Sequence, residues 1–290
     1  MNSIKNFLFT ELNIRGQHIQ LDDAWQAMLK NRHYPAPLIT MLGELTAITV
    51  MLASGLKHAG KVTIQVQGTG PVNLLVVEAT HDLKIRGVAK TKADAKISEQ
   101  HDTDDLLGDG KILVTLENTL TNSHFQSYVP REATNSQNSI AQSFENFLTQ
   151  SDQQPSKLWL AANEHGLGGV LIQKMPLSEN IDADGWERVK VLSNTLSTEE
   201  IIQLDSETLI HRLFNEELVK LFEGKEIQYH CPKDFSRVEN MLLSLGKEEV
   251  QKIIDEQGEI VVHNEMCNFH ARYNQTDIDK LFKETLKGDT

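Results

Sequence analysis

The apolar stretch 38–56 constrains the fold of this 290-residue chain more than any other segment. It is long and apolar enough for a transmembrane helix, and Pro35 and Pro37 just before it suit a helix start. The stretch contains Glu44, however, and a lone carboxylate in the middle of a bilayer is costly. We therefore interpret it as a buried core helix. The chain is 39% hydrophobic, which is enough apolar material for such a core.

Residues 1–177 predict an α/β domain. An amphipathic helix is expected at 22–31, before the apolar helix. Residues 61–67 alternate between polar and apolar side chains, which is typical of a half-buried strand, and a tight turn follows at 68–71. Further strands are expected at 74–79, 83–89, 112–117, 124–129, 158–162 and 170–175, and a second amphipathic helix at 136–150.

The charge of the chain changes near Pro176. Residues 1–177 carry 15 basic and 17 acidic side chains, a charge of −2, whereas residues 178–290 carry 13 and 24, a charge of −11. The segment 184–222 predicts several short helices, one of them opened by the capping box of Ser197 and Glu200. Helices this short are unstable alone and must pack on another surface. Residues 178–229 are therefore predicted to form a metastable helical linker.

The last segment, 230–290, predicts a small module of helices and one hairpin. A helix capped by Ser236 and Glu239 should end at Gly246, and a second helix should end at Gly258. A hairpin with its turn near 264–267 and a final helix capped at Thr276 complete the module. The overall fold class is therefore α+β.

Both cysteines of the chain, Cys231 and Cys267, lie in this small module, with His230, His263 and His270 close to them in sequence. A module of about 60 residues has a thin core and usually needs a disulfide or a metal. Two cysteines buried as small apolar residues are the simpler alternative. A zinc knuckle usually draws its ligands as two close pairs, whereas each pair here would have only one cysteine.

No enzyme motif stands out. The chain has no G-x-S-x-G elbow, no H-E-x-x-H helix and no G-x-x-x-x-G-K-[ST] loop, and its glycine-rich stretches 68–70 and 166–169 are explained by turn geometry. Neither catalysis nor nucleotide binding is expected. The net charge of −13 also disfavours binding to nucleic acid or to an anionic membrane.

Several long segments together are more specific than any single motif: 62–77 (VTIQVQGTGPVNLLVV), 85–89 (IRGVA), 106–116 (LLGDGKILVTL), 168–176 (GGVLIQKMP) and 236–260, which includes SRVENMLLSLGKEEV and DEQGEI. With these segments in this order, essentially the whole chain resembles the 33 kDa chaperonin family of redox-regulated heat-shock holdase chaperones. The resemblance implies an α/β substrate-binding domain at 1–177, the metastable linker at 178–229 and a zinc-domain-like module at 230–290.

The family's redox switch implies four cysteines, arranged as C-x-C and C-x-x-C, which hold zinc. Oxidation forms one disulfide within each pair, releases zinc, unfolds the small domain and frees the linker to capture clients. Cys231 matches the first cysteine of C-x-C, but Lys233 stands at the second position. Cys267 matches the last cysteine of C-x-x-C, but Asn264 stands at its partner position. Neither within-pair disulfide can form, so the redox and zinc regulation should be weakened or altered.

Three alternatives are open for the cysteines. His230, His263 or His270 could complete a Cys2His2-like zinc site with them. A Cys231–Cys267 disulfide could form if their Cα atoms lie within roughly 7 Å, and would stabilise the module, opposite in sense to the family switch. A metal-free fold that opens under heat or another stress is the interpretation we favour.

The sequence thus predicts a non-enzymatic, ATP-independent holdase that binds unfolding or oxidatively damaged proteins. Its cysteine usage and the absence of a signal-peptide core point to the cytoplasm, and the resemblance implies a homodimer on activation. Two other functions stay open: a thiol- or metal-dependent enzyme that uses Cys231 or Cys267, and a non-enzymatic zinc adaptor. The linker residues expected to contact clients are Ile201, Ile202, Leu209, Leu213, Phe214, Leu218 and Phe222.

Overall fold

The computed structural model describes residues 1–131, 140–176, 184–232 and 235–285. The chain divides into two units, Met1–His230 and Cys231–Thr290. The predicted α+β class is confirmed, since helices and strands alternate irregularly and the strands pair mostly antiparallel.

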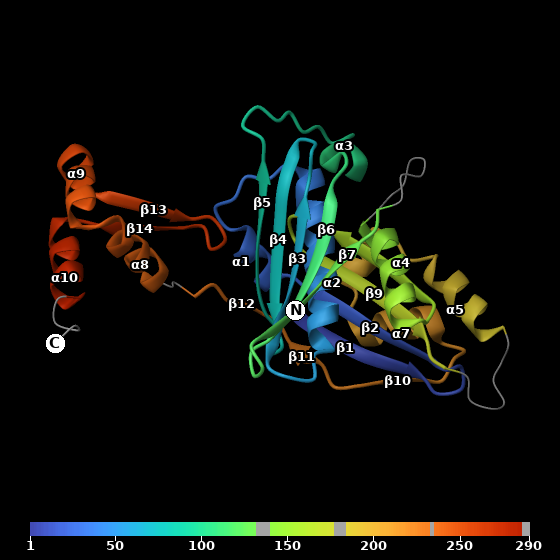
Figure 1. Cartoon of the computed structure of the whole chain (residues 1–290). Coiled ribbons are helices and arrows are strands. Elements are labelled where there is room, and N and C mark those ends of the chain that lie inside the picture. Colours follow the sequence, from blue (N-terminus) through green and yellow to red (C-terminus); the bar gives the residue numbers. More distant parts are fainter. Residues whose placement is uncertain (132–139, 177–183, 233–234, 286–290) are drawn as a thin grey trace. The chain divides into compact units, whose positions relative to one another are not determined.

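The first unit contains two six-stranded sheets (Figure 1). Sheet A has the order β10 (Val219–Leu221), β1 (Asn2–Phe9), β2 (Ile14–Leu21), β9 (Leu167–Lys174) and β8 (Ser156–Ala162), with β11 (Lys225–Glu226) also paired to β1. Sheet B has the order β12 (Gln228–Tyr229), β5 (Lys84–Thr91), β4 (Val72–Thr80), β3 (Gly60–Gln67), β6 (Lys111–Asn118) and β7 (Ser123–Val129). Only β12 and β5 pair in parallel among these described strands.

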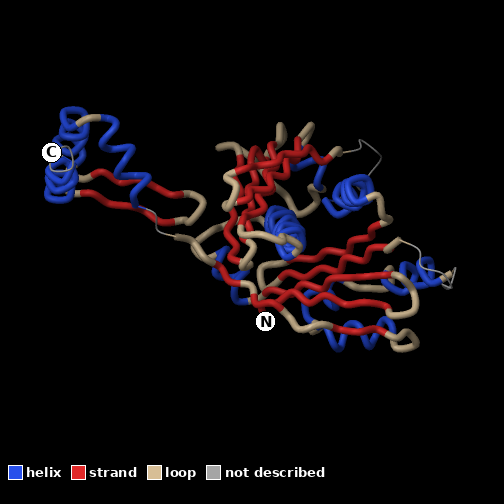
Figure 2. Tube along the Cα trace, turned by 60° about the horizontal axis from the view of Figure 1, so that its bottom comes forward, coloured by secondary structure: helices blue, strands red, loops and turns tan. Residues whose placement is uncertain are grey.

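Helix α2 (Ala36–Ser54) lies between the two sheets and contacts strands of both (Figure 2). By length and composition it could cross a membrane, but 67% of its most apolar window is buried inside the protein. The interpretation as a core helix is therefore confirmed. Three further helices complete this part: α1 (Asp23–Leu29), α3 (Thr103–Leu107) and α4 (Ile140–Asp152).

The strands predicted between residues 61 and 175 are all present, with ends that differ by up to three residues. The helix predicted at 136–150 is α4, and its predicted first residues, 136–139, lie outside the described residues. Strands β1 and β2 and helix α3 were not predicted. In β2 the polar residues His18 and Gln20 are buried, so the alternation of polar and apolar side chains that usually marks a strand is lost.

The predicted linker forms α5 (Gly185–Ser193), α6 (Thr198–Gln203) and α7 (Ser206–Phe214). These helices belong to the first unit, and the unit boundary falls at His230 and Cys231. The capping box is confirmed, since the Ser197 side chain accepts from Glu200 N and the Glu200 side chain accepts from Ser197 N. The helical interpretation of 218–222 was wrong, because β10 in this segment pairs with β1 and forms the edge of sheet A.

The second unit contains α8 (Phe235–Leu245), α9 (Lys247–Gln257), the hairpin of β13 (Ile260–Asn264) and β14 (Phe269–Tyr273), and α10 (Gln275–Thr285). Gly246 and Gly258 lie after α8 and α9 with φ of 86° and 80°, as the predicted helix ends require. Two predicted caps were wrong. Helix α8 begins before Ser236, and the cap of α10 is Asn274, whose Oδ1 accepts from Asp277 N at 3.1 Å.

Candidate functional site

The outer face of sheet A, opposite α2, is covered by α5 and α7. Its apolar side chains, which we call the linker face, are Phe7, Phe9, Ile14, Val170 and Ile172. They pack against Val189, Leu209, Ile210, Leu213 and Phe214 of the two helices. The rings of Phe9 and Phe214 meet edge to face with centroids 4.9 Å apart. All these side chains are buried, so the two helices hide a continuous apolar surface of the sheet.

Five of the seven linker residues predicted to contact clients are buried. Ile201 and Ile202 of α6 pack with Ala161 of β8 in a small cluster of their own. Leu209, Leu213 and Phe214 of α7 pack against the linker face. The other two, Leu218 and Phe222, are 63% and 41% exposed.

Helix α6 approaches β9 closely because Gly168 has no side chain. A Cβ atom at Gly168 would collide with the backbone carbonyl oxygen of Ile201. The turn geometry proposed for the glycines at 166–169 was therefore wrong for Gly168, which lies in β9 under α6. Only a residue without Cβ allows the helix backbone to pack directly on the strand.

Two polar side chains of β2 lie buried under α6 and α7, and sequence analysis missed them. His18 Nδ1 lies 2.7 Å from Ser206 Oγ at the start of α7, and Gln20 Nε2 donates to the carbonyl of Ile202 at 2.8 Å. His18 Nε2 and Gln20 Oε1 are buried and have no protein partner among the described residues. Burial lowers the pKa of His18 to about 4. An unsatisfied buried polar atom costs about 1–3 kcal/mol, so this contact weakens the docking of the linker.

A cavity of about 510 Å³ lies on the inner face of sheet A. Its apolar lining includes Leu8, Ile48, Met51, Leu158 and Leu171, and Phe222 stands at its edge. A further group of apolar side chains is exposed on and beside the edge strand β7, where Leu120, Phe125 and Tyr128 are each more than 60% exposed. The first unit therefore presents apolar surface even while the linker is docked.

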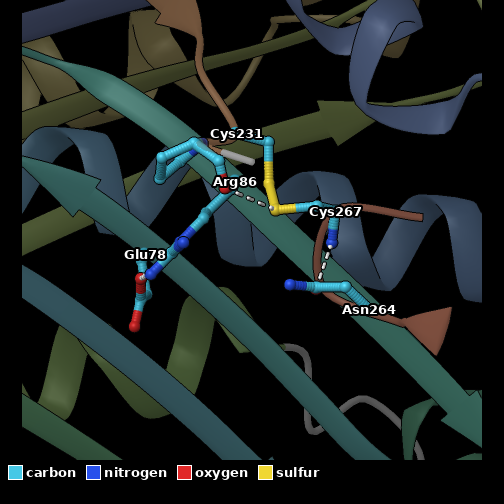
Figure 3. The surroundings of a disulfide bond; sticks show 6 residues. Glu78, Arg86, Cys231, Asn264 and Cys267 are labelled. Carbon is cyan, nitrogen blue, oxygen red and sulfur yellow. Dashed lines mark hydrogen bonds and ion pairs between the residues drawn. A yellow bond between two sulfur atoms is a disulfide. The ribbon is translucent and has the colours of Figure 1, made fainter. Parts of the chain in front are cut away.

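The two cysteines of the second unit form a disulfide, with their Cα atoms 5.5 Å apart (Figure 3). This distance satisfies the roughly 7 Å limit for the pairing considered as one alternative. Asn264, at a family cysteine position, accepts a hydrogen bond from Cys267 N at 3.1 Å and so holds the hairpin turn. Lys233, at the other substituted position, lies outside the described residues.

Among the described residues, no group of three or more His, Cys, Asp or Glu side chains could hold a metal ion. His263 and His270 face each other across the hairpin with stacked rings 4.4 Å apart, and His263 Nε2 lies 3.2 Å from Asn268 Oδ1. His230 belongs to the first unit. The sulfurs are bonded to each other and offer no thiolate, so the oxidised pair does not fit a zinc ion. Zinc binding by the reduced pair stays a prediction.

Known proteins resemble the chain over nearly its full length. A family model described as Hsp33 protein matches residues 2–274. A 33 kDa chaperonin of Nitrosococcus oceani is 35% identical over 286 residues, which is 99% of this chain and 96% of that protein. Another, of Neisseria meningitidis, is 36% identical over 282 residues, 97% of this chain and 92% of that protein.

The crystal structure of a 33 kDa chaperonin from Thermotoga maritima has the same fold. It superposes with a TM-score of 0.79 at 19% identity and covers 99% of this chain and 100% of that one. The predicted resemblance is confirmed. The chain belongs to the Hsp33 family, and this membership supports a chaperone function.

Proposed function

We propose that this protein is an ATP-independent holdase that binds unfolding or oxidatively damaged proteins through apolar surface on the first unit. The observation that carries the proposal is the linker face, a continuous apolar surface of sheet A that only short helices cover. When α5, α6 and α7 leave the sheet, this surface and the apolar sides of the helices become available to clients. We expect the protein to act in the cytoplasm, to form dimers when activated, and to bind neither nucleic acid nor membranes.

The covering helices are weakly held. They have 9, 6 and 9 residues, below the roughly 12–15 at which even good helix formers are marginal in water. Their stability must come from packing on the sheet, and part of that packing is offset by the unpaired atoms of His18 and Gln20. A segment held in this way opens at a smaller free-energy cost than the core does.

Surface that is already exposed would make the first contact with a client. Phe125 and Tyr128 on β7 lie at a sheet edge, and Phe222 borders the cavity beside α2. The cavity can accept an apolar side chain of the client once contact is made. The charge of −11 on residues 178–290 would keep the complex with a client soluble.

Redox regulation would differ in sense from that of a four-cysteine relative. A single disulfide between Cys231 and Cys267 links residues 36 positions apart and restricts the unfolded second unit. Oxidation would therefore stabilise this unit, whereas reduction would loosen it. Heat is the trigger that we expect to release the linker.

An aggregation assay tests the proposal. A thermally denatured client is followed by light scattering with equimolar protein, without ATP, at 25 °C and 43 °C, with and without peroxide. The wild type should suppress aggregation at the higher temperature. Leu209→Asp, which places a charge on the linker face, should suppress aggregation already at 25 °C, whereas Val191→Asp, at a position 64% exposed on α5, should behave as the wild type. No suppression by the wild type or by Leu209→Asp under any of these conditions would refute the holdase function.

A further inference from the structure

Where α7 meets sheet A, a histidine without a complete set of partners lies in the interface. His18 is 1% exposed, and its neighbours across the sheet are Lys5 on β1 and Val170 on β9. Its Nδ1 atom lies 2.7 Å from Ser206 Oγ, and its Nε2 atom is buried without a protein partner among the described residues. The neutral ring fits this environment because its second nitrogen can stay unprotonated.

We propose that His18 makes the docked linker sensitive to acid: when the ring takes up a second proton, α6 and α7 leave sheet A. The proton would add a charge and a second N–H donor at a site with no acceptor for it. Once the helices leave, water solvates the ring, and the charged form is no longer penalised. The consequence for clients rests on the proposed holdase function, but the opening itself does not.

The charged groups around the ring act in both directions. Asp205 and Glu207, at the start of α7, favour the protonated ring, whereas Lys5 opposes it and donates to Glu207 Oε1 at 2.6 Å. Hydrogen bonds from Thr208 hold the pKa of Asp205 below its usual value, so Asp205 stays ionised in mild acid. Burial is the largest influence on the ring and outweighs both carboxylates.

The sign of the effect follows from the two states. The pKa of His18 is about 4 in the docked state and returns towards its ordinary value of 6.5 when the helices are released. The released state therefore binds the proton more readily, and docking weakens as the pH falls from 6.5 to 4. Between pH 7.5 and 5.5 the ratio of docked to released molecules should fall about tenfold, because one proton is taken up over roughly one pH unit of this window.

Hydrogen exchange with mass spectrometry on the full chain tests the proposal. Exchange of peptides that cover 198–214 is compared at pH 7.5, 6.5 and 5.5, corrected for the intrinsic exchange rate, with peptides that cover β8 and β9 as the internal reference. The opening equilibrium of α6 and α7 should rise about tenfold from pH 7.5 to 5.5, whereas the opening equilibrium of the reference peptides should not rise. A wild-type opening equilibrium that does not change with pH would overturn the proposal without any variant.

Two substitutions assign the proton. In His18→Asn the amide can still reach Ser206 from the position of Nδ1 but cannot be protonated, so the pH dependence should disappear. His211→Asn removes an exposed histidine from α7 and should keep the full wild-type response. A pH dependence that persists in His18→Asn would overturn the assignment.

The aggregation assay at pH 5.5 separates this proposal from the holdase function. If α6 and α7 open in acid but no client is captured, the proposed acid-induced release of the two helices stands and the holdase function fails. If clients are captured on heating but α6 and α7 do not open in acid, the holdase function stands and the role of His18 fails.

Discussion

The two faces of sheet A are covered in contrasting ways. The inner face meets α2, one helix of 19 residues, of which 12 are buried and nine belong to the main apolar core. The outer face meets three helices of 9, 6 and 9 residues, and the contact includes the incompletely paired His18 and Gln20. Because both covers share one sheet, the comparison isolates two differences between them, helix length and the pairing of buried polar atoms. The proposed release of the outer cover depends on these differences rather than on apolar burial alone.

The largest effect should come from truncating a leucine on each face. Leu45 of α2 and Leu209 of α7 are both 0% exposed. Leu45→Ala should lower the free energy of unfolding of the first unit by about 2–5 kcal/mol, because it leaves a cavity in the main core. Leu209→Ala should instead raise hydrogen exchange in 198–214 and leave the denaturant midpoint of the sheets almost unchanged. Equal shifts of that midpoint in both variants would mean that the linker unfolds together with the core.

The contrast between the faces also explains what could be predicted from the sequence. Helix α2 was predicted because its apolar residues occur on all sides of the helix. The capping box of Ser197 and Glu200 was predicted because it depends only on two residues three positions apart in sequence. Strand β2 was missed because His18 and Gln20 are polar although they are buried under α7 and α6. In the sequence, such residues suggest a face exposed to solvent. Polar residues in a strand are informative only once the element above them is known.

Other features depend on contacts between distant residues. The pairing of β10 with β1 overrides the apolar spacing that suggested a helix at 218–222. The cysteines are 36 residues apart in sequence, and this separation does not determine the distance between them in the fold. The 5.5 Å between their Cα atoms therefore required the structure. The cap at Asn274 could have been predicted from the sequence, because Asn274 and Asp277 have the spacing of a capping box.

The second unit is stabilised in a third way. Its described residues contribute eight buried apolar side chains to a core, and a disulfide supplements them. Closing a loop of this length stabilises a fold by about 4 kcal/mol in the chain-entropy model. Reduction, or Cys231→Ser with Cys267→Ser, should therefore raise hydrogen exchange throughout 235–285 and leave α2 protected. If the reduced unit instead binds zinc and stays protected, metal analysis will show one zinc per chain, and the metal-free interpretation will be wrong.

Helix α2, which covers the inner face, carries its own titratable group, and this group should act in the opposite direction to His18. Burial raises the pKa of Glu44 in α2 to about 8. Because the unfolded state loses this proton near pH 4.5, stability should fall as the pH rises from 4.5 to 8, by about 3 kcal/mol at pH 7. Glu44→Gln should remove this loss and raise the stability of the first unit at pH 7, but not at pH 4. Denaturant titrations at both pH values measure the effect, and an equal gain at the two would show that the charge of Glu44 is not its cause.

The smallest effect concerns a single methyl group under the linker. Gly168→Ala should push the Ile201 carbonyl away from β9 and weaken the docking of α6 by about 1–3 kcal/mol, the usual cost of overpacking. Gly55→Ala adds the same group after α2, where the new Cβ would lie 3.5 Å from the Leu52 carbonyl oxygen, an ordinary contact. Trypsin cleavage after Arg212, which is exposed on α7, should speed up in Gly168→Ala and stay at the wild-type rate in Gly55→Ala. Unchanged cleavage in Gly168→Ala would mean that α6 can shift without loosening α7, so that the outer cover would open helix by helix rather than as one piece.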